Sequence, residues 1–287
     1  MTTPTNDEQP RLMRLGHSPD SDDAFMFYAL AEHKIPTDGF AFEHILRDIE
    51  TLNQWAREGK LEITAISVHA YAYVADQYAI LSHGASMGDN YGPMVVSRDP
   101  AADVDWLRGK RIAIPGTMTS AYLALRLFLG DFDYDVVPFD QIMEAVHEGR
   151  YDAGLLIHEG QLTHGELGLH TLVDLGKWWH GETNGLPLPL GVNAVRRDLG
   201  PETMAALSRV LKASIQYGLD HREPALQHAM QFARGLSTET ADAFVGMYVN
   251  DWTVDMGPRG KESIRLFLER AARQGVIPAE VPVDFVD

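Results

Sequence analysis

The sequence predicts an α/β fold of two lobes with a central cleft between them. The chain has 287 residues, which is too long for one simple core and suits two lobes of about 100–180 residues each. Strand-like and helix-like segments alternate along the chain, an order typical of mostly parallel sheets. Hydrophobic residues make up 45% of the chain and charged residues 23%, as expected of a globular protein with a full core.

The composition excludes several classes of function. The formal net charge is −17, which repels nucleic acid and anionic membranes, so neither is predicted as a partner. The chain has no cysteine, which excludes disulfides, thiolate catalysis and cysteine-ligated zinc. No stretch approaches the roughly 18–20 apolar residues of a membrane helix. Residues 1–11 are polar and predict a disordered leader and no secretion signal, so we expect a cytoplasmic protein.

The first predicted lobe is discontinuous and comprises residues 12–98 and 196–287. Its predicted strands are at 12–16, 40–46 and 63–68, and its helices at 18–30, 48–58, 201–221, 223–234, 239–248 and 260–274. We expect the first helix to begin with Ser18 as N-cap and Pro19 in the first turn. Three acids follow, which are Asp20, Asp22 and Asp23. Their charges suit the positive end of the helix, and they could alternatively hold hydroxyls or a cation at the cleft mouth.

The second predicted lobe comprises residues 99–195. Its predicted strands are at 111–115, 136–137 and 153–157, and its helices at 121–129 and 141–148. The chain is expected to enter this lobe near 98–100 and to leave it near 192–195. The apolar run 153–157 is typical of a central parallel strand. Two-lobed α/β proteins of this kind close on their ligands by hinge motion.

His158 follows the apolar run 153–157 directly. Open α/β sheets bind ligands beyond the carboxyl ends of their strands, so we expect this side chain to face the cleft. Imidazole titrates near neutral pH and suits a general base. The alternative is a structural histidine that caps a strand end. The spacing of His158 and His164 excludes a zinc protease motif, which requires two histidines one helical turn apart.

The turn at 115–120 joins a predicted strand to a predicted helix. Free backbone N–H groups at the helix start, together with the hydroxyls of Thr117, Thr119 and Ser120, predict a site for an anion. The turn has no Lys or Arg, which favours a carboxylate over a polyphosphate. Ordinary N-capping is the alternative. Ser67 and His69 end the strand at 63–68, and we expect them to face the same crevice across from Ser120.

Several further motifs occur along the chain from Leu12 onward. They are Ser18-Pro19 with Asp23, Glu50-Thr51-Leu52-Asn53, Pro115-Gly116, Ile157-His158-Glu159, Trp178-Trp179, Gly185-Leu186-Pro187-Leu188-Pro189-Leu190-Gly191 and Arg197-Asp198-Leu199-Gly200. With these motifs the chain resembles the 1,4-dihydroxy-6-naphthoate synthase family, which acts in the futalosine pathway of menaquinone biosynthesis. The resemblance covers nearly the whole chain.

The resemblance implies a periplasmic-binding-protein-like (type II) fold and a carbon–carbon lyase that needs no metal and no other cofactor. It implies cyclic dehypoxanthine futalosine, a small-molecule aromatic carboxylate, as substrate, with 1,4-dihydroxy-6-naphthoate and dihydroxyacetone as products. His158 matches the family's general base. The implied substrate-binding residues are Ala65, Ile66, Ser67, Thr119, Ser120 and Ala121. Lobe closure would exclude water from the reaction.

One segment departs from the family pattern. Where the family has Ser-Pro-Cys-Pro-Asn-Asp, this chain has Ser18-Pro19-Asp20-Ser21-Asp22-Asp23. A change from Asn to Asp replaces a donor and acceptor by an anion. The alternatives are therefore a divergent member that acts on a related aromatic carboxylate, a chorismate dehydratase, or a non-catalytic protein that binds a small carboxylate. The sequence leaves open the oligomeric state and the roles of Glu159 and His69.

Overall fold

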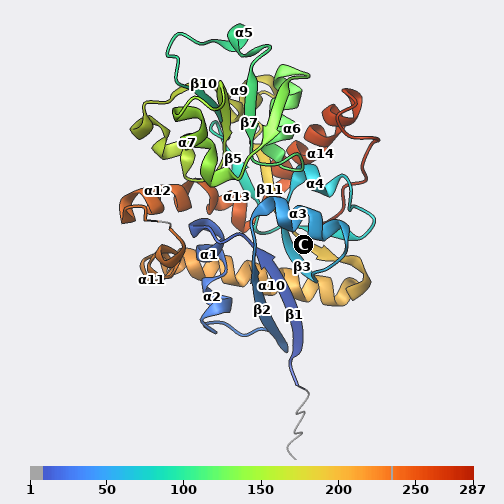
Figure 1. Cartoon of the computed structure of the whole chain (residues 1–287). Coiled ribbons are helices and arrows are strands. Elements are labelled where there is room, and N and C mark those ends of the chain that lie inside the picture. Colours follow the sequence, from blue (N-terminus) through green and yellow to red (C-terminus); the bar gives the residue numbers. More distant parts are fainter. Residues whose placement is uncertain (1–8, 234) are drawn as a thin grey trace, which may run out of the picture.

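Two mixed sheets, each covered by helices, form the two lobes (Figure 1). The structure is a computed structural model and describes residues 9–233 and 235–287. Sheet A has the order β12 (Phe285–Val286), β4 (Tyr78–Leu81), β11 (Leu188–Arg196), β3 (Ile63–Ser67), β1 (Arg11–His17) and β2 (Phe40–Leu46), and β5 (Ser86–Gly88) pairs with β11. Sheet B has the order β10 (His170–Asp174), β6 (Met94–Ser97), β9 (Ala153–Leu156), β7 (Arg111–Ile114) and β8 (Asp133–Val136).

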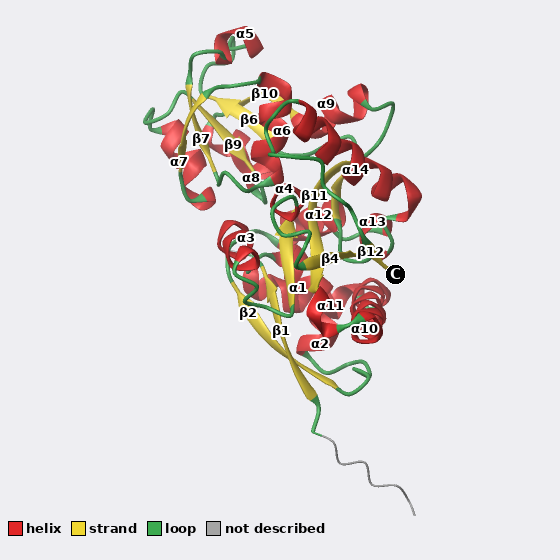
Figure 2. Cartoon of the chain, turned by 90° about the vertical axis from the view of Figure 1, so that its right-hand side faces the viewer, coloured by secondary structure: helices red, strands yellow, loops and turns green. Residues whose placement is uncertain are grey.

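Helices surround both sheets (Figure 2). In chain order they are α1 (Ser21–Met26), α2 (Tyr28–Ala31), α3 (Ile49–Arg57), α4 (Val68–Tyr71), α5 (Val104–Leu107), α6 (Ser120–Leu129), α7 (Ile142–His147), α8 (Gly160–Thr163), α9 (Leu175–Glu182), α10 (Pro201–Asp220), α11 (Arg222–Ala229), α12 (Thr238–Tyr248), α13 (Asp251–Val254) and α14 (Gly257–Arg273). None of these described helices is both long and apolar enough to cross a membrane.

The cores of the two sheets are connected. One hydrophobic cluster includes Ile66 and Val192 of sheet A and continues to Ile112 and Leu155 of sheet B. A second cluster packs Met13 and other β1 side chains against α1 and α10 on the far part of sheet A. Burial of apolar area on this scale is the main favourable term in folding. The shared cluster therefore fixes how the carboxyl ends of the strands in the two sheets face each other.

The period and punctuation of the sequence predicted most long elements correctly. The predicted strands at 12–16, 40–46 and 63–68 correspond to β1, β2 and β3, and the helix from Asp48 corresponds to α3. The side chain of Asp48 accepts the N–H of Thr51, as an N-cap does. The predicted end of a helix at Arg234 and residues 1–8 of the predicted leader lie outside the described residues. Arg11, which was placed in that leader, pairs with Phe40 in β1.

The prediction that α1 begins at Ser18 and Pro19 is wrong. The helix begins at Ser21, and Asp20 is its N-cap residue with an extended backbone, φ −114° and ψ 160°. The N–H of Ser18 donates to the carboxylate of Asp23, 2.6 Å away. This bond keeps the chain before the helix extended, because the side chain of a helical residue binds the backbone that precedes it. The helix then breaks at Phe27 and resumes as α2, which the apolar run did not predict.

The prediction of mostly parallel strands is also wrong. β11 runs antiparallel to β3, β4 and β5, and β6 runs antiparallel to β9 and β10. Each of these two strands comes directly after the chain has passed from one sheet to the other, without a helical crossover that would turn it parallel. The alternating pattern shows the elements but contains no signal for the direction from which a strand enters its sheet.

The two crossings come earlier in the chain than predicted. β6 already belongs to sheet B, so the chain changes sheets between Gly88 and Met94, and β11 belongs to sheet A, so it returns between Glu182 and Leu188. The segments at 98–100 and 192–195 are therefore not the crossings. The division into lobes at 12–98, 99–195 and 196–287 stays a prediction as a division into folding units.

Candidate active site

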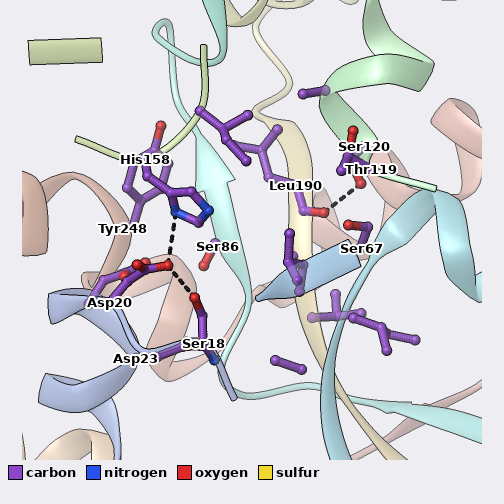
Figure 3. Close-up of a pocket in the computed structure, with 18 of the residues that line it drawn as sticks. Ser18, Asp20, Asp23, Ser67, Ser86, Thr119, Ser120, His158, Leu190 and Tyr248 are labelled. Atoms are coloured by element: carbon purple, nitrogen blue, oxygen red, sulfur yellow. Dashed lines mark hydrogen bonds and ion pairs between the residues drawn. The ribbon is translucent and has the colours of Figure 1, made fainter. Parts of the chain in front are cut away.

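A cavity with an empty volume of about 750 Å³ is lined by residues of both sheets (Figure 3). Pockets that bind small ligands commonly measure about 300–1,000 Å³. Its walls come from the carboxyl end of β3, the middle of β11, the start of α6, the segment after β9, and α1 and α12. The cavity therefore lies where the sheet topology predicts a ligand site, beyond the carboxyl ends of the strands.

All seven residues that the sequence indicated for the site line this cavity. They are Ala65, Ile66 and Ser67 on β3, Thr119, Ser120 and Ala121 at the start of α6, and His158 after β9. In Figure 3, His158 lies with Asp20 and Ser18 on one side of the view, and Ser67, Thr119 and Ser120 lie on the other. Their placement at strand and helix ends gave the signal. Their roles in binding and catalysis stay predictions.

His158 is held by a carboxylate and by an aromatic ring. Its Nδ1 lies 3.1 Å from Oδ2 of Asp20, and its ring meets that of Phe139 edge-on at 4.7 Å between centroids. Its backbone has φ +55°, a left-handed conformation that L-residues other than glycine seldom adopt and that clusters at functional sites. Its Nε2 is buried and has no hydrogen-bond partner among the described residues. The structure therefore presents this nitrogen to the cavity.

Three buried carboxyl groups stand beside His158. Asp20, Asp22 and Asp23 are exposed by only 2%, 8% and 9%, so the prediction of an acidic lip at an open cleft mouth is wrong. Burial and the neighbouring carboxylates raise the pKa of Asp22 to about 8. Burial also raises the pKa of Asp23 to about 7, although the N–H of Ser18 opposes this rise. Asp22 is therefore largely protonated at neutral pH.

Protonation changes what the departure from the family pattern means. A neutral carboxyl group has one O–H donor and a carbonyl acceptor, as the amide of asparagine also has a donor and an acceptor. Asp22 stands where the family pattern has Asn, and its Oδ1 has no hydrogen-bond partner in residues 9–233 and 235–287. The expected replacement of a donor and acceptor by an anion is thus not what burial produces at neutral pH.

The start of α6 shows which donors remain for an anion. The hydroxyl of Thr119 accepts the N–H of Tyr122 at 3.1 Å and donates to the carbonyl of Gly116 at 2.9 Å, which is ordinary N-capping. The hydroxyl of Ser120 donates to the carbonyl of Leu190 at 2.5 Å. The backbone N–H groups of Ser120 and Ala121 donate to no other described residue. The available donors are thus backbone groups, and the two hydroxyls are already engaged.

His69 does not face the cavity, contrary to the prediction. Its ring is buried and stacks on Tyr122 at 6.2 Å, and burial lowers its pKa to about 4. Only its backbone N–H reaches the site, where it donates to the hydroxyl of Ser120 at 3.3 Å. The strand β3 continues directly into α4, whose first turn rotates His69 away from Ser67. Glu159 at the start of α8 does not line the cavity either.

Two residues of α3, which the sequence gave only as a motif, join the site together. Asn53 accepts the N–H of Ser67 at 2.8 Å and donates to its hydroxyl at 3.0 Å. Glu50 accepts the N–H of Met118 at 3.1 Å, in the turn before α6. A Cβ on Gly116 would lie 2.4 Å from Oε2 of Glu50, so glycine allows this approach. α3 thereby ties the turn of sheet B to β3 of sheet A.

The C-terminal helices supply a wall that sequence analysis missed entirely. Phe244 and Tyr248 of α12 line the cavity together with Gln161. The hydroxyl of Tyr248 donates to Oε1 of Gln161 at 2.8 Å, and burial raises its pKa. These residues lie in an amphipathic helix whose pattern indicates burial but not what it is buried against. No local signal could have found them.

Residues 13–273 match a protein family described as menaquinone biosynthesis. The chain belongs to this family. It is 42% identical to a protein of Thermus thermophilus named "1,4-dihydroxy-6-naphtoate synthase" over 94% of this chain and 98% of that protein. It is 37% identical to a Streptomyces coelicolor protein of the same name over 94% of this chain and 96% of the relative. The resemblance seen in the motifs is confirmed, and with it the prediction of an enzyme of the lyase class.

Solved structures confirm the fold. A crystal structure of a protein from Archaeoglobus fulgidus matches with a TM-score of 0.88 and 45% identity over 93% of this chain and 98% of that one. The alkanesulfonate-binding protein of Xanthomonas axonopodis matches with a TM-score of 0.69 at 16% identity, over 96% and 97% of the two chains. The menaquinone biosynthesis family member described here thus has the predicted periplasmic-binding-protein-like fold.

The raised pKa of Asp22 predicts a pH-dependent stability. Because the folded state keeps a proton that the unfolded state releases above about pH 4, the free energy of unfolding falls as pH rises toward about 8. Asp22→Asn removes this titration and keeps the shape. We expect the variant to melt at least about 3 °C above the wild type at pH 8, with a smaller difference at pH 5.

Differential scanning calorimetry across this pH range measures the effect. Asp103→Asn, at the exposed N-cap of α5, is the matched control and should show little difference at any pH. Equal melting temperatures for Asp22→Asn and the wild type at every pH contradict a raised pKa.

The close approach of Glu50 to Gly116 gives a second prediction. Gly116→Ala places a Cβ 2.4 Å from Oε2 and 2.8 Å from Cγ of Glu50, so the carboxylate must leave the N–H of Met118. We expect the free energy of unfolding to fall by about 1–3 kcal/mol, the usual cost of overpacking. Urea denaturation measures it. Gly165→Ala, where a Cβ meets nothing within 4 Å, is the control, and a similar small change in both variants argues against the α3 contact.

Proposed function

We propose that this enzyme cleaves cyclic dehypoxanthine futalosine into 1,4-dihydroxy-6-naphthoate and dihydroxyacetone. The observation that carries the proposal is the unpartnered, buried Nε2 of His158, which lines a cavity with a free helix start. The relatives named as synthases of the same naphthoate support it, because they match over 94% of this chain. His158 acts as the general base in this proposal.

The reaction follows a retro-aldol-like course. Nε2 of His158 takes the proton of a substrate hydroxyl, a carbonyl forms at that carbon, and the adjacent carbon–carbon bond breaks. The electron pair of this bond enters the ring system, which becomes aromatic after a proton is returned to the products. Atoms and electrons balance without an oxidant or reductant. Aromatisation supplies the thermodynamic drive, and the protein supplies position and a base.

The carboxylate of the substrate binds at the start of α6. The N–H groups of Ser120 and Ala121 point from the positive end of a ten-residue helix, and no described Lys or Arg lines the cavity. An anion tolerates the nearby acids because Asp22 and Asp23 have raised pKa values and carry less negative charge than exposed carboxylates. Ala65, Ile66 and Ser67 of β3 contact the rest of the substrate in this proposal.

The substitutions in α1 bear on the alternatives. Asp20 stands where the family pattern has Cys, and it faces the cavity. A divergent member acting on a related aromatic carboxylate is therefore the second candidate function, and turnover of the futalosine derivative distinguishes the two. A chorismate dehydratase or a binding protein without catalysis would leave this substrate intact. Action in the cytoplasm stays a prediction of the sequence.

Replacement of His158 tests the proposal. Wild-type protein should convert cyclic dehypoxanthine futalosine to dihydroxynaphthoate, detected by mass spectrometry. We expect His158→Asn to lower kcat by about 10²–10⁴-fold, the usual loss on removal of a general base. Asparagine suits this position because it tolerates a positive φ better than most residues.

His170→Asn, at an exposed position of β10, is the matched control and should keep the wild-type rate. Circular dichroism shows whether both variants fold. Near wild-type turnover by folded His158→Asn excludes His158 as the base. Tight substrate binding without turnover by the wild type favours the divergent or non-catalytic alternative.

A further inference from the structure

We propose that Asp20 is a positioning residue for His158: its carboxylate accepts the Nδ1–H of the ring and thereby leaves Nε2 unprotonated toward the cavity. This inference deepens the proposed function, since it rests on His158 as the base. A neutral imidazole carries one proton on one of its two nitrogens, and the hydrogen bond made by one nitrogen decides the state of the other. A base needs the free lone pair on the side of the substrate.

The geometry of the pair supports this role. Nδ1 of His158 and Oδ2 of Asp20 are 3.1 Å apart, and the two side chains are exposed by only 16% and 1%. A hydrogen bond shielded from water in this way is stronger than an exposed one. The edge of the Phe139 ring limits rotation of the imidazole from another side. Figure 3 shows the ring directed at Asp20 with its other nitrogen away from the carboxylate.

A second donor fixes the carboxylate itself. The hydroxyl of Ser18 donates to the same Oδ2 of Asp20, and Asp20 occupies the N-cap position of α1. The backbone of Ser18 is in turn held by Asp23. The orientation of the imidazole therefore depends on a chain of contacts that runs from α1 through Asp20 to the segment after β9.

The neighbouring acids do not take this role. Asp23 accepts the N–H of Ser18, and Oδ1 of Asp22 has no partner among the described residues. Glu159 is the sequence neighbour of His158 but does not line the cavity. Asp20 is the carboxylate within hydrogen-bond distance of Nδ1. The residue that orients the base thus comes from sheet A, whereas the base itself follows a strand of sheet B.

The carboxylate also acts during the proposed reaction. When Nε2 takes the substrate proton, the ring becomes a cation beside Asp20, and a buried anion at hydrogen-bond distance stabilises that cation. Without this acceptor a free imidazole prefers to carry its proton on Nε2, the nitrogen that must stay unprotonated. Loss of Asp20 should therefore lower kcat strongly and change KM little, because the substrate contacts on β3 and α6 remain.

The tautomer can be measured directly by ¹H–¹⁵N correlation NMR on protein with ¹⁵N-labelled histidine. The resonances of His158 are identified by their loss in His158→Asn. In the neutral ring we expect Nδ1–H in the wild type and a shift toward Nε2–H in Asp20→Ala, with kcat lower by about 10²-fold and KM within about threefold. Asp22→Asn, a change at the neighbouring buried acid, is the control and should keep the wild-type tautomer.

Wild-type protein with the proton on Nε2, or Asp20→Ala with the Nδ1–H tautomer and wild-type kcat, overturns the role of Asp20. If Asp20→Ala does not fold, Asp20→Asn keeps the shape and removes the charge. A fall in kcat of about tenfold or more at unchanged KM in that variant supports the inference, and wild-type kcat overturns it. The tautomer needs no substrate, so absence of lyase turnover in the wild type rejects only the proposed function.

Discussion

The hydrogen bond between Nδ1 of His158 and Oδ2 of Asp20 is the contact on which the arrangement of the site depends. It joins the carboxyl end of β9 in sheet B to the start of α1, which packs on sheet A. The bond between Glu50 and the N–H of Met118 joins the same two parts of the molecule on the other side of the cavity. Because both bonds need the two sheets at this separation, formation of the cavity and orientation of its histidine are one structural event.

Burial gives the cavity its electrostatic character. Asp22 and Asp23 cannot both ionise easily in a region that water hardly reaches, and their pKa values rise accordingly. The local charge is thus much less negative than the net charge of −17 suggests. The free N–H groups of Ser120 and Ala121 then offer the positive potential. A small aromatic carboxylate suits this combination better than a cationic or strongly charged ligand does.

The sequence predicted those parts of the fold and site that depend on local pattern. Strand ends located Ser67 and His158, and a strand-to-helix turn located Thr119–Ala121, because each of these features lies within a few neighbouring residues. The pairing of Asp20 with His158 was not predictable, since it arises only when sheet A and sheet B meet. The same holds for Tyr248, and for His69, which a single turn of α4 carries away from the cavity. The directions of β6 and β11 were missed because they depend on the path between lobes.

A crystal structure with 1,4-dihydroxy-6-naphthoate bound tests the central claim most directly, namely that the chemistry takes place between Nε2 of His158 and the start of α6. The account predicts that the product carboxylate accepts the N–H groups of Ser120 and Ala121, and that a ring hydroxyl lies within hydrogen-bond distance of Nε2. The Nδ1 contact with Asp20 should be kept. A product bound elsewhere in the cavity, with Nε2 of His158 in contact with protein alone, would contradict the account.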